Sequence, residues 1–340
     1  MIGKVILLIF GLLVVGLALL FSTSNQTVPP LNPPSLTISQ EFFWSSKPEG
    51  ELIFVGDVML SRAIGRLMEK KSDWSYPFRL SANWLADADL TIGNLEGPLS
   101  DKGHDQGGIY SFRADPRATQ GLLAVGFDVL SLANNHMLDW GREALVDTTD
   151  RLTAARLMPV GAGRNYTEAN TPYIAEVNGT KIAFLSYTNL MSQDAWATED
   201  RPGLSTPTIK AVQEVIKNLR PQVNLIVLLW HWGDEYETAA NPRERALARA
   251  LIDAGADLII GGHPHVAQEV EKYHNGYIAY SLGNFVFDQN FSEDTRRGLA
   301  LRVVLKNGVI KRVVPLEVKF TSTFQPQIAV SSTPEVKVVE

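Results

Sequence analysis

Short apolar runs that each end in polar residues are the feature that most constrains this chain. They lie at residues 51–55, 88–92, 127–132, 182–185, 223–229, 257–260 and 277–280. Runs of this length are typical of buried strands. Helical patterns lie between several of them, at residues 61–70, 116–125, 142–155, 208–219 and 242–254. Because strands and helices alternate, the sequence predicts an α/β fold.

Two stretches depart from this alternation and predict β-hairpins. Residues 173–187 alternate in polarity around Asn178-Gly179, and residues 298–316 do so around Asn307-Gly308. Asn-Gly between alternating apolar residues is a strong hairpin signal, because both residues tolerate the backbone of a tight turn.

Composition narrows the classes of function. The chain of 340 residues has a formal net charge of -6, which gives no basic surface for a nucleic acid. It contains no cysteine, so a metal ion would be held by carboxylate, imidazole or amide groups, or by water. The length suits one large domain or two ordinary ones.

The N-terminus predicts a membrane anchor. Residues 5–21 are all apolar or glycine, and as a helix they would span roughly 25 Å, enough for a bilayer core. Lys4 precedes this run and the next basic residue is Lys47, so the positive-inside rule places the rest of the chain outside the cell membrane. A cleaved signal peptide is the alternative, with the small residues Ser22 to Ser24 after the cut and a secreted product.

The chain divides into four expected segments. Residues 1–21 form the transmembrane anchor, and residues 22–50, rich in Pro, Ser and Thr, form an extended linker. Residues 51–320 form the main domain. Residues 321–340 are again rich in Ser, Thr and Pro, and we expect a flexible tail there.

Polar residues follow most of the predicted strands. The clusters are Gly56-Asp57, Gly93-Asn94-Leu95-Glu96, Asn134-Asn135-His136, His231-Trp232-Gly233, Gly261-Gly262-His263-Pro264-His265 and Gly283-Asn284. In open α/β sheets the functional site lies beyond the carboxyl ends of the strands. We therefore expect carboxylates, imidazoles and amides to converge at one sheet edge.

Most of these residues also have a structural interpretation. Asp57 and Glu96 could cap a turn or a helix, and Asn94 and Asn135 could close turns through their own backbone. The segment His263-Pro264-His265 is different. Proline favours an extended residue before it, and extended residues two apart project to the same side, which predicts two imidazoles aimed at one metal ion.

Further polar residues are candidates for supporting roles. Asp139 follows His136 by three positions and Glu235 follows His231 by four, so each could orient an imidazole or simply be solvated. Arg113 could meet an anionic substrate group or form a surface ion pair.

The motifs together resemble a known family. Phe54-Val55-Gly56-Asp57-Val58-Met59-Leu60, Gly93-Asn94-Leu95-Glu96, Asn134-Asn135-His136, His231-Trp232-Gly233, Gly262-His263-Pro264-His265 and Ser281-Leu282-Gly283-Asn284-Phe285 resemble the CapA/PgsA poly-γ-glutamate capsule synthesis family. That family looks like an offshoot of the calcineurin-like metallophosphoesterases. The resemblance implies a four-layer α/β/β/α sandwich with a dinuclear metal centre at the strand ends.

The resemblance also implies roles for individual residues. The expected metal ligands are Asp57, Glu96, Asn135, His231, His263 and His265, with Glu96 as the carboxylate between the metals. The resemblance gives His136 a catalytic role. From their positions in the sequence, Asp139 is its expected catalytic partner, and the expected substrate contacts are Asn94, Arg113, Glu235 and Asn284. Met59 stands where the superfamily has a histidine ligand, so one metal position loses an imidazole. We expect one or two divalent ions, with Mn, Zn and Fe all compatible with such ligands.

Two functions follow as expectations. The first is a metal-dependent hydrolase or transferase that cleaves a phosphoester or a γ-glutamyl amide in a cell-envelope polymer such as poly-γ-glutamate. The second is a non-catalytic subunit that binds or guides the polymer in a capsule synthase complex with membrane subunits.

Overall fold

The computed structural model describes residues 49–329 and 338–339. The predicted anchor at residues 1–21 and nearly all of the predicted linker lie outside this part of the chain. Among the residues described, no helix is both long and apolar enough to cross a membrane.

The first of two large sheets has the strand order β16-β15-β14-β1-β2-β3-β4, and β13 pairs with β1 off this path. β1 runs parallel to β2 and antiparallel to β14. The strands are β1 (Gly50–Val58), β2 (Leu90–Leu95), β3 (Val129–Ser131), β4 (Met158–Val160), β13 (Asn284–Val286), β14 (Arg297–Lys306), β15 (Val309–Phe320) and β16 (Pro326–Ile328).

The second large sheet has the order β17-β11-β12-β10-β9-β7-β6, and its central strands β7, β9, β10 and β12 are parallel. The strands are β6 (Tyr173–Val177), β7 (Thr180–Thr188), β9 (Leu225–His231), β10 (Leu258–Gly262), β11 (Val270–Tyr273), β12 (Gly276–Ala279) and β17 (Val338–Val339). A separate short pair joins β5 (Ala162–Gly163) to β8 (Gly203–Leu204).

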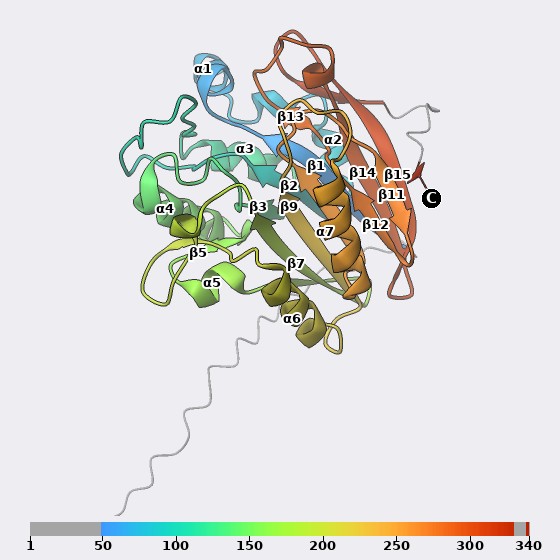
Figure 1. Ribbon diagram of the computed structural model, residues 1–340. Coiled ribbons are helices and arrows are strands. Elements are labelled where there is room, and N and C mark those ends of the chain that lie inside the picture. Colours follow the sequence, from blue (N-terminus) through green and yellow to red (C-terminus); the bar gives the residue numbers. More distant parts are fainter. Residues whose placement is uncertain (1–48, 330–337, 340) are drawn as a thin grey trace, which may run out of the picture. The chain divides into compact units, whose positions relative to one another are not determined.

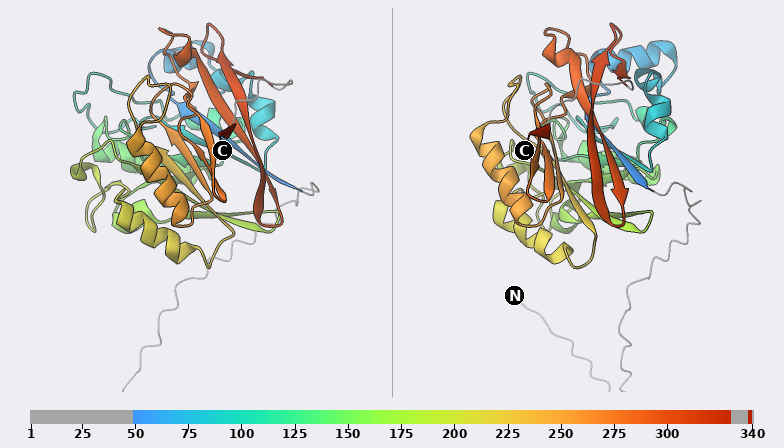
Figure 2. Two further views of the ribbon diagram at one scale, coloured as in Figure 1. Left: turned by 45° about the vertical axis from the view of Figure 1, so that its right-hand side comes forward. Right: turned by 90° about the vertical axis from the view of Figure 1, so that its right-hand side faces the viewer.

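Helices cover the outer faces of the two sheets (Figures 1 and 2). The α-helices are α1 (Arg62–Lys71), α2 (Ala82–Ala86), α3 (Ala118–Ala124), α4 (Gly141–Ala154), α5 (Tyr166–Asn170), α6 (Ile209–Leu219) and α7 (Pro242–Asp253). Short 3-10 helices lie at Tyr76–Phe78, Gln193–Ala195 and Asp294–Arg296. In Figure 1, α6 and α7 lie together beside the second sheet.

Side chains of β1 point alternately to its two faces, and so they belong to two different hydrophobic layers. Ile53 and Val55 face the helices, in one cluster with α1, α3 and α4. Leu52 and Phe54 face the other way, in a cluster shared with β7, β9 and β10. This second cluster is the apolar layer between the sheets, as the period of two along a strand requires.

The third hydrophobic layer lies between the second sheet and its helices. Ile226 and Leu228 of β9 pack with Val212 and Ile216 of α6 and with Leu251 of α7. Three apolar layers therefore separate four layers of secondary structure. The order of these four layers is helices, sheet, sheet, helices (α/β/β/α). Each predicted apolar run contains or overlaps an observed strand, and both hairpins form, as β6–β7 and β14–β15.

The expectation of a flexible tail from residue 321 is wrong for the residues up to 329. β16 pairs with β15, and the Gln325 side chain, which is buried, donates to the carbonyl of Tyr76 at 2.7 Å. The domain therefore extends past residue 320. The reason lies in the tertiary structure. The edge of β15 carries backbone N–H and C=O groups that pair with those of β16, and neither strand has a local sequence pattern that predicts this pairing.

Candidate metal centre

Sheet register places the predicted site residues side by side. In the first sheet, Asp57 is the register partner of Asn94 on one side and of Asn284 on the other. In the second sheet, His231 pairs with Gly262, directly before His263. The sheets meet where the His263 backbone N–H donates to Asp57 Oδ2 at 3.3 Å. Strand ends of both sheets therefore form one cluster, whereas the sequence predicted convergence at the edge of one sheet.

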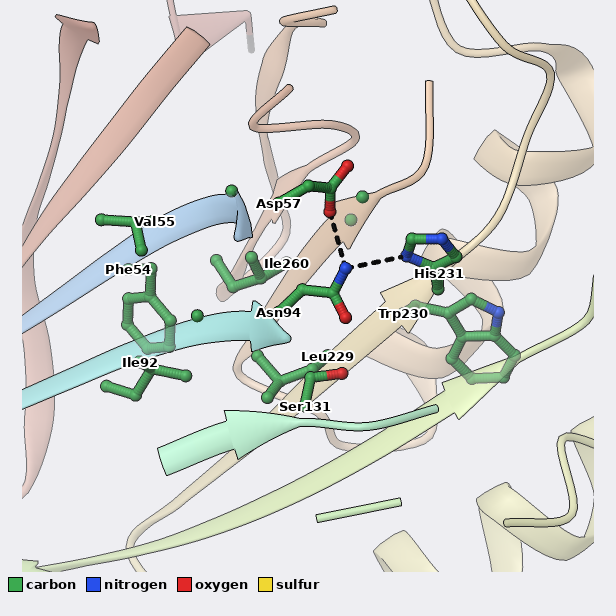
Figure 3. A pocket seen from close by; sticks show the side chains of 14 residues that line it. Phe54, Val55, Asp57, Ile92, Asn94, Ser131, Leu229, Trp230, His231 and Ile260 are labelled. Atoms are coloured by element: carbon green, nitrogen blue, oxygen red, sulfur yellow. Dashed lines mark hydrogen bonds between the residues drawn. The ribbon is translucent and has the colours of Figure 1, made fainter. Parts of the chain in front are cut away.

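Asn94 lies at the centre of this cluster (Figure 3). Its Nδ2 atom donates to Asp57 Oδ1 at 2.8 Å and also to Glu96 Oε2. The same nitrogen lies 3.4 Å from His231 Nδ1. A small cavity between the sheets lies against these groups. Its lining includes Ser131 of the first sheet and Trp230 of the second (Figure 3).

His231 faces a second set of ligand atoms through its other nitrogen. His231 Nε2 lies 2.9 Å from Asn135 Oδ1 and 3.4 Å from Glu96 Oε1. His231 and Glu96 are both buried. An imidazole nitrogen, an amide oxygen and a carboxylate oxygen thus face one another away from water, and all three are atom types that ligate transition metals.

His265 lies at the Asp57 end of the cluster. Its Nδ1 atom is 3.1 Å from Asn284 Oδ1 and 3.3 Å from Asp57 Oδ2. Asn284 in turn donates to Gln289 Oε1 at 3.2 Å, and Gln289 donates to the hydroxyl of Tyr236 at 3.3 Å. A chain of hydrogen bonds therefore connects His265 to Tyr236, which is 41% exposed.

The backbone of the His263-Pro264-His265 segment differs from the expectation. We predicted extended residues, but His263 has a φ of 99° and His265 a φ of 59°, so both are left-handed. The imidazoles still converge, with ring centroids 5.9 Å apart. Each such residue costs on the order of 1–3 kcal/mol. Tertiary contacts hold this loop, including the bond from the Tyr236 backbone to the Pro264 carbonyl at 2.8 Å.

His136 and Asp139 form a hydrogen-bonded pair beside the cluster. His136 Nδ1 lies 2.8 Å from Asp139 Oδ2, and His136 Nε2 lies 4.0 Å from Glu96 Oε1. The same Asp139 oxygen accepts the Phe112 backbone N–H at 2.8 Å, and the Phe112 ring stacks on His136 with centroids 4.0 Å apart. Asp139 thus has the geometry of an orienting carboxylate rather than of a solvated one.

Two buried atoms of the cluster lack a hydrogen-bond partner: Glu96 Oε1 and His263 Nδ1. An unpaired carboxylate oxygen and an unpaired imidazole nitrogen are costly to bury, and a bound cation would satisfy both. Two groups have ligand atoms within 4.8 Å of one another, namely Asp57 with Glu96 and His231, and Glu235 with His263 and His265. The residues present therefore fit a divalent metal.

The electrostatics favour the metal-ligating forms of Glu96 and His263 but not of His265, where burial is outweighed by the hydrogen bond and charge of Asp57, which raise the pKa. Burial opposes ionisation of Glu96, yet the charges of His231 and His136 outweigh it and hold the pKa of this carboxyl well below its usual range. Burial, with the imidazoles of His231 and His265, lowers the pKa of His263 to about 2. Glu96 is therefore ionised and His263 neutral at physiological pH, and these are the forms that ligate metals.

Two residues discussed from the sequence lie in other surroundings. The Arg113 guanidinium lies 3.5 Å from the centroid of the Trp140 ring, and no contact described for it reaches a cluster residue. Met59 is fully buried in the core beside α1, where its sulfur accepts the Ser61 hydroxyl at 3.0 Å. The position that the superfamily gives to a histidine is therefore occupied by a core side chain.

Sequence reasoning missed three residues around the cluster. Asn134 donates to Asn94 Oδ1 at 3.0 Å, and its place beside Asn135 was the available signal. Arg62 lies over the Phe112 ring with its guanidinium 5.5 Å from the centroid, and pairs with Asp288 at 3.2 Å. Tyr236 packs against His265 with centroids 6.3 Å apart. Arg62 and Tyr236 lie where the chain leaves a strand for a loop or helix, and no local pattern marks them as site residues.

The family can now be assigned from comparison. Residues 51–289 match the model of the bacterial capsule synthesis protein PGA_cap. The chain belongs to this family. Among its PGA_cap relatives, the capsule biosynthesis protein CapA of Bacillus anthracis is 36% identical, over 79% of this chain and 67% of the relative. The PGA biosynthesis protein CapA of Bacillus subtilis is 32% identical, over 82% of this chain and 77% of the relative.

A solved structure shows where this fold occurs elsewhere. The 5'-nucleotidase precursor of Thermus thermophilus superposes with a TM-score of 0.50 and 16% identity, over 82% of this chain and 56% of that one. At this identity the likeness concerns the fold alone. The expected family and the α/β fold are thus confirmed.

Proposed function

We propose that this CapA homologue acts outside the cell membrane as a metal-dependent hydrolase or transferase on an anionic cell-envelope polymer, such as poly-γ-glutamate. The observation that carries the proposal is the pair of unpartnered buried atoms, Glu96 Oε1 and His263 Nδ1, within a cluster of carboxylates and imidazoles. The membrane anchor at residues 5–21 and an association with capsule synthase membrane subunits belong to the same proposal and rest on the sequence and the family.

The residues divide the chemistry among them. Glu96, Asn135, His231 and His263 would hold a divalent metal such as Mn, Zn or Fe, which supplies a water of lowered pKa and polarises the scissile group. His136 presents Nε2 on the cluster side, while its Nδ1 is held by Asp139 at 2.8 Å. A proton on Nε2 can therefore pass to the leaving group, and Asp139 keeps the ring in that orientation.

Arg62 and nearby aromatic residues support an anionic substrate. Arg62 has a side chain that is 38% exposed, is held by Asp288, and covers the Phe112 ring that stacks on His136. Tyr110, which is 61% exposed, lies within 6.0 Å of the same guanidinium. A fixed guanidinium beside the imidazoles suits a carboxylate or phosphate, because its planar fork can donate two hydrogen bonds to either.

Metal-dependent cleavage is the first expected result. The purified full chain, stripped with a chelator and reloaded with Mn²⁺ or Zn²⁺, is incubated with poly-γ-glutamate and with a phosphoester, and the products are separated by size and charge. We expect cleavage of the polymer that disappears on chelation and returns with metal. Cleavage of the phosphoester alone would show that the substrate is a phosphoester and not poly-γ-glutamate. A metal-loaded chain that cleaves neither would favour the second candidate.

The second candidate is a non-catalytic subunit that binds or guides the polymer. Met59 favours it, because this core residue removes an imidazole that the metallophosphoesterases use for chemistry. Such a subunit would bind the polymer in the presence of metal without shortening it.

Arg62→Gln should weaken the binding of an anionic substrate. The change keeps much of the length of the side chain and removes its charge, so we expect KM to rise about tenfold, the effect of losing about 1.4 kcal/mol, with kcat changed less than about twofold. Steady-state kinetics on the cleaved substrate measures both constants.

Arg117→Gln is the matched control for Arg62→Gln. Arg117 also pairs with an aspartate, Asp115 at 2.6 Å, and lies over an aromatic ring, that of Trp74 at 4.4 Å. It is not in contact with a cluster residue among the contacts described, so KM should stay unchanged. Equal effects of the two changes would mean that only the overall charge of the domain matters.

A further inference from the structure

The amide nitrogen of Asn94 stands where a cation would stand. It donates to Asp57 Oδ1 at 2.8 Å and to Glu96 Oε2, and it lies 3.4 Å from His231 Nδ1. These three residues form one of the two groups whose ligand atoms lie close enough together to hold a metal. Figure 3 shows the Asn94 side chain between Asp57 and His231.

Asn134 fixes the orientation of the Asn94 amide. Asn134 Nδ2 donates to Asn94 Oδ1 at 3.0 Å and to the Leu95 carbonyl at 2.8 Å. The orientation of Asn134 is set in turn, because its Oδ1 accepts the His136 backbone N–H at 3.1 Å. A flip of the Asn94 amide would set its NH₂ against that of Asn134 and its oxygen against two carboxylates. Both contacts would then be repulsive.

The other side of the same two ligands is open. Glu96 turns Oε2 to Asn94 and leaves Oε1 without a hydrogen bond. His231 turns Nδ1 to Asn94 and Nε2 to Asn135 Oδ1, at 2.9 Å. The unpartnered Nδ1 of His263 belongs to a ring whose centroid is 5.1 Å from that of His231. The unpartnered Glu96 Oε1 therefore lies on the side of His231 Nε2 and Asn135, 3.4 Å from His231 Nε2.

We infer that the centre holds one divalent metal, on the side of Asn135, and that Asn94 closes the second position with its amide. The inference deepens the proposed function and rests on its metal dependence. An N–H donor cannot ligate a metal, so the Asn94 amide supplies Asp57 and Glu96 with hydrogen bonds in place of a positive ion. Met59, buried in the core, removes an imidazole independently. Glu235, His263 and His265 form a separate candidate group, and His263 is also one of the four residues assigned above to the metal on the Asn135 side.

Metal counting tests the inference. The full chain and Asn94→Asp are stripped with a chelator, dialysed against Mn²⁺ or Zn²⁺, and analysed for metal per chain by mass spectrometry, with folding checked by circular dichroism. We expect one metal per wild-type chain and two per Asn94→Asp chain, because a carboxylate replaces the donor between Asp57 and Glu96. Without metal, Asn94→Asp should melt at a lower temperature, since three carboxylates then meet. Asn135→Asp, an amide-to-carboxylate change on the open side, should keep the count at one.

The outcomes separate this inference from the proposed function. Two metals in the wild-type chain would overturn the inference and leave the proposed function standing. This result does not depend on whether the variant folds. A folded Asn94→Asp that still binds one would also overturn it. One metal in the wild type and two in the variant, with no cleavage of any substrate, would support the inference and contradict the enzymatic function. No metal in the wild type would contradict both.

Discussion

His263→Ala is expected to abolish metal binding while leaving the metal-free fold in place. The Nδ1 atom of His263 is buried without a hydrogen-bond partner, so its removal relieves an unsatisfied polar group while it leaves a cavity. These two effects offset each other to within about 1–2 kcal/mol. Metal at about 100 times its Kd stabilises a protein by about 2.7 kcal/mol, and the variant should lose most of this stabilisation. Thermal unfolding with and without metal measures the difference.

Polymer production should disappear with the metal. A strain whose own copy is deleted would make no polymer with His263→Ala and normal amounts with His274→Ala, a control at a turn whose side chain is 66% exposed. A His263→Ala chain that gains the full stabilisation from metal would show that His263 is not a ligand. Normal polymer production without bound metal would remove the catalytic proposal and leave the polymer-binding one.

Gly56→Ala should cause a large loss of stability. A Cβ atom at Gly56 would lie 1.9 Å from the carbonyl oxygen of Gly283, a backbone atom that cannot rotate away. Relief of this clash would separate β1 from residue 283 and break the hydrogen bond from Asp57 N to Gly283 O, now 3.0 Å. We expect the free energy of unfolding to fall by about 3 kcal/mol or more, measured by denaturant unfolding.

Gly65→Ala is the matched control for Gly56→Ala. Gly65 lies inside α1, and a Cβ there would meet one neighbour, the Leu60 carbonyl oxygen, at 3.2 Å. Alanine is the better helix former by up to about 1 kcal/mol, so this change should be neutral or stabilising. Unchanged stability of Gly56→Ala would mean that the two backbone segments are not in close contact in solution.

Local sequence determined the elements of this fold. Apolar runs such as residues 223–229 can bury both faces only as central strands, and Asn178-Gly179 and Asn307-Gly308 turn the chain where the sequence predicts. The polar residues after these strands were recognisable because parallel strands end at a common edge, which brings Asp57 and Asn94 together. The packing of the two sheets adds His231.

Long-range contacts decided the remaining features. The left-handed backbone of His263 and His265 depends on bonds to Asp57 and Tyr236, distant in sequence, which outweigh the local preference set by Pro264. The pairing of β16 with β15 likewise follows from an edge that only the assembled sheet exposes.

The features of the metal centre are likewise set partly by the sequence and partly by the tertiary structure. The sequence by itself determined which polar side chains stand at strand ends, because residue type and strand ends are local properties. Only the tertiary structure decided which way the Asn94 amide points, since Asn134, 40 positions away, sets it through a hydrogen bond of 3.0 Å. It also decided that Arg62 covers Phe112 beside His136. Hydrogen-bond direction and the meeting of loops depend on atoms brought together by folding, and no spacing along the chain encodes them.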